Sequence, residues 1–264
     1  MSTIGLKGAS GLGDTIIAYP IVKYYAERYD TVYYMTDYPE LYELLDNVEC
    51  YPHQKVNYFR LRDGNRHPVD VRFTYCPRKY TPGTSQFQDS CLSAKVPIDL
   101  PLKIDLNLAK YKRDKPYCVL AAPYEPFGRE DEWGAVLRIV PKVVQNIVDE
   151  YKDRMDFVQI GNDFVLHKID GTHDLVGSTT VIELMGLVAN ADVTLSQIGN
   201  LLPMSEALGK KSFTIFSKSG LETENKFISS ITPGKTVHYK DLNCSIIDDD
   251  RKAVEKFGRF THLI

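Results

Sequence analysis

The sequence predicts an α/β protein with two Rossmann-like domains that face each other across a cleft, each with a parallel sheet. Short apolar runs rich in β-branched residues alternate with helical segments, which is the pattern of a parallel sheet. Both halves of the chain repeat this architecture, and each has its own glycine turn. The charged, apolar-poor segment 107–115 separates them and is followed by Pro116, which is typical of a linker. We therefore expect an N-terminal domain over residues 1–112 and a C-terminal domain over residues 113–264.

The composition is that of a soluble globular protein, with 264 residues of which 43% are hydrophobic and 25% charged. The formal net charge of -3 argues against a non-specific nucleic-acid coat but leaves room for a local basic groove. The chain has no apolar run of membrane-spanning length and no signal peptide, so we expect a cytoplasmic protein. Its cysteines form no C-x-x-C pair, which favours reduced thiols over disulfides or a zinc site; they are Cys50, Cys76, Cys91, Cys118 and Cys244.

The N-terminal stretch 2–25 predicts a strand over Ile4–Leu6, a glycine-rich turn over 8–14 and then a helix. The helix is expected to bury residues on one face, namely Ile16, Ile17, Pro20, Ile21 and Tyr24. The glycines of such a turn let the backbone come close to a ligand, while the first helical N–H groups point into the same crevice. The turn has neither the G-x-G-x-x-G spacing of a dinucleotide site nor the lysine of a P-loop. A tight turn without a ligand is therefore the alternative interpretation.

Asp14 is the candidate catalytic residue of this turn. It is either the capping carboxylate of the helix or a base aimed at whatever enters the crevice. Ser10, Gly11 and Gly13 complete the acceptor or donor loop. Ser10 either hydrogen-bonds a substrate or braces the turn.

The remaining elements follow from periodicity and from turn residues. In the N-terminal half we expect strands over 31–35, 48–51 and 69–73 and helices over 38–45 and 86–94. In the C-terminal half we expect strands over 117–121, 157–160, 192–195 and 213–216 and helices over 135–151, 180–190, 204–208 and 249–257. Thr179 or Thr180 caps the helix over 180–190, with Glu183 in its first turn. The last helix is expected to return to the N-terminal domain.

Gly11-Leu12-Gly13-Asp14 and the apolar helix after it resemble the N-terminal signature of the lipopolysaccharide heptosyltransferase family. Residues 174–184 (DLVGSTTVIEL) resemble its D-L-x-G-x-[ST]-[ST]-x-x-E-L segment, and residues 189–192 the end of the helix that follows. Residues 206–210 (EALGK) resemble its A-A-L-G-K turn, and residues 160–162 stand where it has a glycine turn after a strand. The resemblance implies a GT-B fold and an inverting, metal-independent glycosyltransferase that uses a nucleotide-diphosphate sugar and no other cofactor.

The chain departs from the family at one motif and in its length. The family's D-[ST]-G-x-x-H segment, which handles the phosphates and sugar of the donor, corresponds to residues 198–203 (IGNLLP), so its Asp and His are both missing. The chain is also shorter than typical members, chiefly in the acceptor-facing half. A different donor sugar or acceptor, or loss of activity, would account for these departures.

The resemblance places the donor site mainly in the C-terminal half. The candidate contacts are Arg129, Trp133, Gly161, Asn162, Glu183, Gly199 and Asn200. For Arg129, an equally weighted alternative is an ion pair with Glu130 or Asp131 on a solvated loop. Glu183 fits a first-turn helix carboxylate better than a sugar contact.

No metal site is expected. Residues 248–250 (DDD) superficially match the D-x-D pattern of metal-dependent transferases, but they directly precede a helix, where acidic residues complement its dipole. The six histidines show no ligand spacing.

Two other functions compete with the leading one. Arginines at positions 60, 62, 66, 72 and 78, Lys79 and interleaved tyrosines would suit the phosphate backbone of DNA, so the acceptor is either a glycan or a modified base in phage DNA. The same residues also fit an ordinary polar surface. The third interpretation is a non-catalytic module that binds nucleotide sugars.

Overall fold

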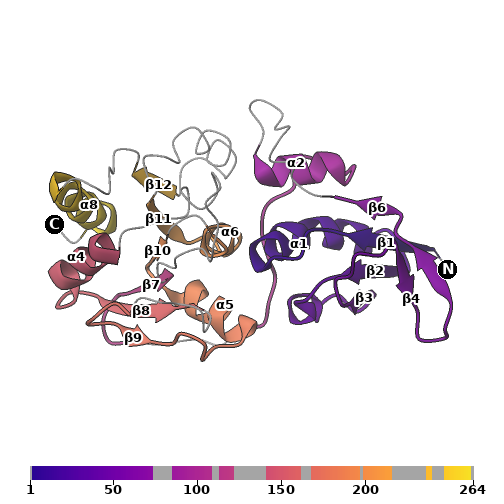
Figure 1. Cartoon of the computed structure of the whole chain (residues 1–264). Coiled ribbons are helices and arrows are strands. Elements are labelled where there is room, and N and C mark those ends of the chain that lie inside the picture. The colour runs from indigo at the N-terminus through magenta and orange to yellow at the C-terminus, as the bar shows by residue number, and fades with distance from the viewer. Residues whose placement is uncertain are drawn as a thin grey trace. The chain divides into compact units, whose positions relative to one another are not determined.

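The computed structural model describes residues 2–73, 85–108, 113–121, 141–161, 168–196, 199–215, 236–239 and 247–262. The chain forms two compact units, of which the first extends to Asn107 and the second begins at Leu108. This division falls within the predicted linker 107–115 and before the expected boundary at residue 112. Each unit contains one main sheet whose strands are all parallel, so the predicted α/β class is confirmed (Figure 1).

The main sheet of the first unit has the strand order β3-β2-β1-β6. Its strands are β1 (Thr3–Lys7), β2 (Thr31–Met35), β3 (Val48–Tyr51) and β6 (Val71–Arg72), and its helices are α1 (Leu12–Ala26), the 3-10 helix η1 (Pro39–Tyr42) and α2 (Gln86–Ser93). The predicted buried strand over 69–73 is thus only two residues long, and the helix expected over 38–45 is a short 3-10 helix.

The helix α1 is buried around most of its circumference rather than on one face. Continuous burial from Thr15 to Val22 follows from its position between the sheet, α2 and η1. Tyr25 rather than Tyr24 is buried at its end, because the Tyr25 hydroxyl donates to the carbonyl of Ala94 at 2.7 Å. Tyr24 stays partly exposed, with the Arg28 guanidinium 3.5 Å from its ring centroid.

A β-hairpin that the sequence did not predict packs on the face of the sheet to which Gly5 and Tyr33 belong. It consists of β4 (Tyr58–Arg60) and β5 (Arg66–Pro68), with Phe59 5.8 Å from the Tyr33 ring. A Cβ at Gly5 would lie 2.3 Å from the carbonyl oxygen of Pro68, so only glycine allows the hairpin to come this close to β1.

The main sheet of the second unit has the strand order β12-β11-β10-β7-β8-β9. Read from β9, this is the 3-2-1-4-5-6 order of a dinucleotide-binding fold. Its strands are β7 (Tyr117–Ala121), β8 (Asp156–Ile160), β9 (His173–Asp174), β10 (Val193–Ser196), β11 (Lys211–Ile215) and β12 (Thr236–Tyr239). Its helices are α4 (Pro141–Tyr151), α5 (Val181–Asn190), α6 (Leu201–Ala207) and α8 (Ile247–Thr261). The short strands β9 and β12 were not predicted, and α6 begins earlier than the expected 204–208.

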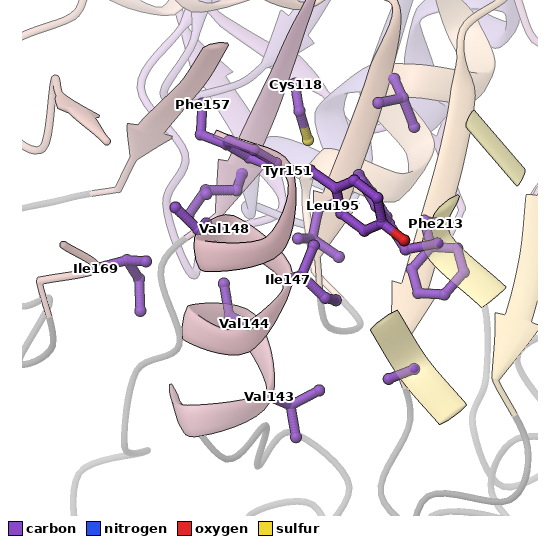
Figure 2. Packing of buried hydrophobic residues seen from close by; sticks show 14 of the residues in the cluster. Cys118, Val143, Val144, Ile147, Val148, Tyr151, Phe157, Ile169, Leu195 and Phe213 are labelled. Carbon is purple, nitrogen blue, oxygen red and sulfur yellow. The ribbon is translucent and has the colours of Figure 1, made fainter. Parts of the chain in front are cut away.

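The core of the second unit lies between this sheet and the helices α4 and α8. Figure 2 shows side chains of α4, including Ile147 and Val148, gathered with Leu195 and Phe213 of the strands. We expected the last helix to return to the N-terminal domain. The structure instead packs α8 beside α4 (Figure 1), and the Phe257 side chain completes the core of the second unit. The apolar face of α8 is therefore used within its own unit.

Candidate functional site

Each sheet has a point where the chain changes direction, and ligands of open α/β sheets bind outside the carboxyl ends of the strands at that point. In the first unit the chain leaves β1 for β2 on one side and later returns to place β6 on the other. In the second unit the corresponding neighbours are β7 and β10. Candidate site residues should therefore lie after the carboxyl end of β1 in the first unit and after the carboxyl ends of β7 and β10 in the second unit.

In the first unit the predicted glycine turn lies at this position, between β1 and α1. Gly11 is the N-cap of α1 in an extended conformation and provides no side-chain cap. Asp14 is therefore not the N-cap residue itself but lies in the first turn, with its carboxylate folded back toward Gly11. Because it accepts from the backbone N–H of Gly11, a capping role stands beside its role as a base. The structure thus places Gly11, Gly13 and Asp14 in the first turn of α1 or at its cap, directly after Ser10.

Burial raises the pKa of the Asp14 carboxyl above its ordinary value, because desolvation disfavours the charged form. A hydrogen bond from the backbone N–H of Gly11 opposes this shift in part. A partly buried carboxylate with a raised pKa is suited to accept a proton.

Tyr34 is a neighbour of this turn that the sequence analysis missed. Its buried hydroxyl lies 3.1 Å from where a Cβ at Gly8 would be, and its ring stacks on Phe73 with 6.4 Å between centroids. The hydroxyl makes no hydrogen bond of good distance and angle to any described residue, although the Tyr42 hydroxyl is near enough to interact with it. Burial is the main cause of its raised pKa; the interaction with Tyr42 opposes this shift, and the negative charge of Asp14 adds to it. Tyr34 lies on the buried face of β2, and the sequence carries no sign of this contact.

Lys7, at the end of β1, uses its ammonium group to hold a neighbouring loop in place. The Lys7 ammonium donates to the carbonyl oxygen of Val56 at 3.0 Å and also to that of Gln54. Burial and the neighbouring Arg72 lower the pKa of Lys7. His53 is fixed next to the same strand end, with its Nε2 3.1 Å from the carbonyl oxygen of Gly8.

In the second unit, three of the predicted donor residues follow strand ends. Gly161 follows β8, while Gly199 and Asn200 lie between β10 and α6. The strands β8 and β10 flank β7, so their carboxyl ends lie at one edge of the sheet. Among the described residues, nothing lies within 4 Å of where a Cβ at Gly199 would be. Arg129, Trp133 and Asn162 lie outside the described residues.

Glu183 forms a capping box with Thr180, which confirms the predicted cap of α5. Its Oε2 accepts hydrogen bonds from the Thr180 backbone N–H at 2.8 Å and from the Thr180 hydroxyl at 2.9 Å. These bonds lower the pKa of Glu183. This carboxylate is accordingly engaged at the helix end, in agreement with the interpretation that we favoured over a sugar contact.

No group of three or more histidine, cysteine or acidic side chains suited to a metal ion occurs among the described residues. Asp248 to Asp250 lie in the first turn of α8. Within the described part of the chain, no helix is both long and apolar enough to span a membrane.

Comparison with solved structures identifies the architecture. The chain aligns with ADP-heptose lipopolysaccharide heptosyltransferase II of E. coli with a TM-score of 0.69 and 12% identity, over 100% of this chain and 99% of that one. It aligns with a family 9 glycosyltransferase of Veillonella parvula with a TM-score of 0.63 and 10% identity, over 100% and 98%. The chain has the GT-B fold. A third GT-B likeness, to the glycosyltransferase TibC of enterotoxigenic E. coli (TM-score 0.63, 15% identity), covers 95% of this chain but only 66% of TibC.

No protein-family model and no curated protein matches the sequence. At these levels of identity the structural likeness shows the fold alone, and the activity rests on the site.

Proposed function

We propose that the protein is a glycosyltransferase that moves a sugar from a nucleotide-diphosphate donor to a hydroxyl acceptor. The observation that carries this proposal is Asp14, a partly buried carboxyl with a raised pKa in the first turn of α1, at the direction change of the first sheet. The GT-B fold supports it, because the aligned heptosyltransferase II is described as an ADP-heptose enzyme and TibC has been crystallised with ADP-heptose.

In the proposed reaction Asp14 is the general base. The acceptor hydroxyl oxygen attacks the anomeric carbon and its proton passes to the Asp14 carboxylate. The bond from that carbon to the diphosphate oxygen breaks, and the electron pair leaves with the nucleoside diphosphate. A single displacement inverts the anomeric configuration and passes through a transition state with oxocarbenium character.

The donor is proposed to bind mainly at the second unit, near Gly161, Gly199 and Asn200. Support comes from their common edge of the sheet, which in a fold with this strand order is where nucleotides bind. Arg129, Trp133, Asn162 and Glu183 remain proposed contacts. We further propose that neither donor binding nor transfer needs a metal ion, so that both should persist in excess chelator. Strict dependence on magnesium would instead favour a role for Asp248 to Asp250.

The hairpin of the first unit favours modified DNA as the second candidate acceptor, after a glycan. Arg60, Arg62 and Arg66 are exposed and none pairs with a carboxylate among the described residues. Arg60 and Arg66 lie directly opposite each other in the hairpin. The aromatic residues are not free to stack on bases, because Phe59 is buried and Arg66 lies 4.5 Å from the Tyr58 ring centroid. The exposed arginines of the hairpin can therefore contact phosphates, but its aromatic residues do not add stacking on bases.

Three measurements test these proposals. A thermal-shift panel of nucleoside diphosphates and nucleotide sugars should reveal stabilisation by one donor class. Transfer from that donor to candidate acceptors separates an enzyme from a non-catalytic binding module. Retention on duplex DNA at rising salt, compared with a variant in which all three hairpin arginines are glutamine, separates the DNA acceptor from a glycan. If no nucleotide sugar stabilises the protein and none is turned over, the proposed function is wrong.

A further inference from the structure

Ser196, the last residue of β10, has a buried hydroxyl without a partner. The residue is only 1% exposed, and its Oγ makes no hydrogen bond to any residue in the described part of the chain. Buried polar groups in folded proteins are almost always hydrogen-bonded, because losing water without gaining a new partner is unfavourable. An isolated hydroxyl of this kind therefore requires an explanation.

The neighbouring hydroxyls on β10 and β11 show that the partner is lacking at Ser196 in particular. Thr194, two residues earlier on the same strand, is 2.8 Å from the Ser205 hydroxyl of α6. Ser205 in turn donates to the carbonyl oxygen of Leu201 at 2.6 Å. On the adjacent strand the hydroxyls of Ser212 and Thr214 are 3.2 Å apart. All four residues are fully buried and each has a partner.

The position of Ser196 indicates what the missing partner is. It ends one of the two strands that flank the direction change of the second sheet, where the fold rule places a ligand. Three residues later, no described residue lies within 4 Å of where a Cβ at Gly199 would be, and Gly199 does not have a positive φ. Glycine at this position leaves the backbone accessible to the close approach of a ligand.

We propose that the Ser196 hydroxyl donates a hydrogen bond to a phosphate oxygen of the donor's diphosphate, which passes close to the backbone at Gly199. A hydroxyl donor beside unobstructed backbone is suited to an anionic oxygen, and such a charge-assisted bond is stronger than a neutral one. The chain has Ile198 and Pro203 where the resembling family has an Asp and a His, so polar contacts to the donor must come from other residues. This inference rests on the proposed function.

The experiment measures the Kd of ADP, GDP, UDP and CDP for the full chain by calorimetry, together with melting temperature. Ser196→Ala should weaken binding of the preferred diphosphate about ten- to hundred-fold, the range for a hydrogen bond to a charged group. Its melting temperature should not fall, because no hydrogen bond is lost in the free protein. Gly199→Ala should weaken the same diphosphate while also melting normally. The matched control is Ser205→Ala, which removes a partnered hydroxyl of the same unit and should lower the melting temperature without changing the Kd.

Each outcome decides between the proposals. If the wild type binds a diphosphate and Ser196→Ala binds it equally well, the role of Ser196 is wrong and the proposed function stands. If no diphosphate binds the wild type, both fail. Should Ser196→Ala be unstable, Ser196→Cys keeps nearly the same volume with a much weaker donor, and unchanged affinity in that variant would refute the contact.

Discussion

The carboxylate of Asp14 lies against the backbone of Gly11: its Oδ2 is 2.9 Å from where a Cβ at residue 11 would be. The absence of a side chain at Gly11 is thus what allows the carboxylate to fold back over the start of α1. The backbone N–H of the same residue stabilises the charged form. Gly11 therefore permits the position of the proposed base and partly offsets the effect of burial on its pKa.

The first prediction concerns Gly11→Ala. The extended backbone at Gly11 (φ -69, ψ 153) accepts alanine, so the melting temperature should change little. The added methyl group must displace the Asp14 carboxylate, and misplacing a catalytic group can lower turnover by about a hundred-fold. Steady-state kinetics on the single variants and on the double variant with Asp14→Asn measure the coupling. If the glycine acts through Asp14, the double variant is no slower than Asp14→Asn alone; additive losses would contradict this.

The second prediction concerns Asp14 itself. Asp14→Asn nearly preserves the volume and can still accept from the Gly11 N–H, but it cannot take a proton. Loss of a general base lowers the rate by about a hundred- to ten-thousand-fold. Diphosphate affinity should be almost unchanged, because the proposed donor contacts lie in the other unit. If Asp14 only stabilises the helix, Asp14→Asn turns over normally and Asp14→Ala lowers the melting temperature instead.

The third prediction is a dependence on pH. The pKa of Asp14 is raised from 3.8, so the base becomes active only as pH rises through a higher value, and the acid limb of kcat/KM should lie above pH 3.8. For stability, a raised pKa means that the native state holds this proton more tightly than the unfolded chain. Charged Asp14 therefore destabilises the native state at neutral pH, and the penalty vanishes once pH falls below 3.8, where both states are protonated. Asp14→Asn should melt no lower than the wild type at pH 7, with the difference closing toward acid. The argument would be contradicted if the melting temperature of Asp14→Asn minus that of the wild type were smaller at pH 7 than at pH 4.

The fourth prediction compares two tyrosines. The Tyr34 hydroxyl makes no well-formed hydrogen bond among the described residues and interacts with the Tyr42 hydroxyl without good geometry. The Tyr42 hydroxyl instead donates to the carbonyl oxygen of Thr15 at 3.0 Å. Tyr34→Phe should therefore be as stable as the wild type or more so, while Tyr42→Phe should lose about 1 kcal/mol or more, because it leaves a buried carbonyl short of a donor. Denaturant titrations of both variants measure this. Equal losses would show that the interaction of the Tyr34 hydroxyl with Tyr42 is a full hydrogen bond.

Most elements of the fold were predictable from local pattern. The strand over 31–35 and the Thr180 cap are set by neighbouring residues along the chain, and both agree with the structure. The hairpin over Tyr58–Pro68 was missed, because its arginines and its short strands give no apolar alternation. The position of α8 was also missed, since an amphipathic helix does not specify which apolar surface it covers.

The residues of the candidate site also include some that the sequence predicted and some that it did not. Asp14 and its glycines were found because a strand, a glycine turn and a helix are contiguous in sequence. Tyr34 and Ser196 were not found, because a buried hydroxyl without a well-formed hydrogen bond is a property of three-dimensional packing and has no local signal.

The last prediction concerns Gly5, on which the packing of the hairpin depends. Gly5 has ordinary backbone angles, yet a Cβ there would meet the Pro68 carbonyl oxygen at 2.3 Å and the Phe59 ring at 2.7 Å. A backbone atom cannot move aside cheaply, so Gly5→Ala should push the hairpin off the sheet. It should also strain the bond from the Gly5 N–H to Asp70, which is 2.7 Å long. Overpacking of this kind costs about 1 to 3 kcal/mol, and more where backbone must move.

The matched control is Gly64→Ala, in the turn of the same hairpin. Gly64 has open space around it but a φ of +84, so alanine there meets only backbone strain, of about 1 to 2 kcal/mol. Urea titrations of both variants should place Gly5→Ala below Gly64→Ala, and near-ultraviolet circular dichroism should change mainly for Gly5→Ala, because Phe59 and Tyr33 lose their contact. If Gly5→Ala were the milder substitution, the hairpin would not depend on close contact with β1, and the arginines it carries would not be held in place by the sheet.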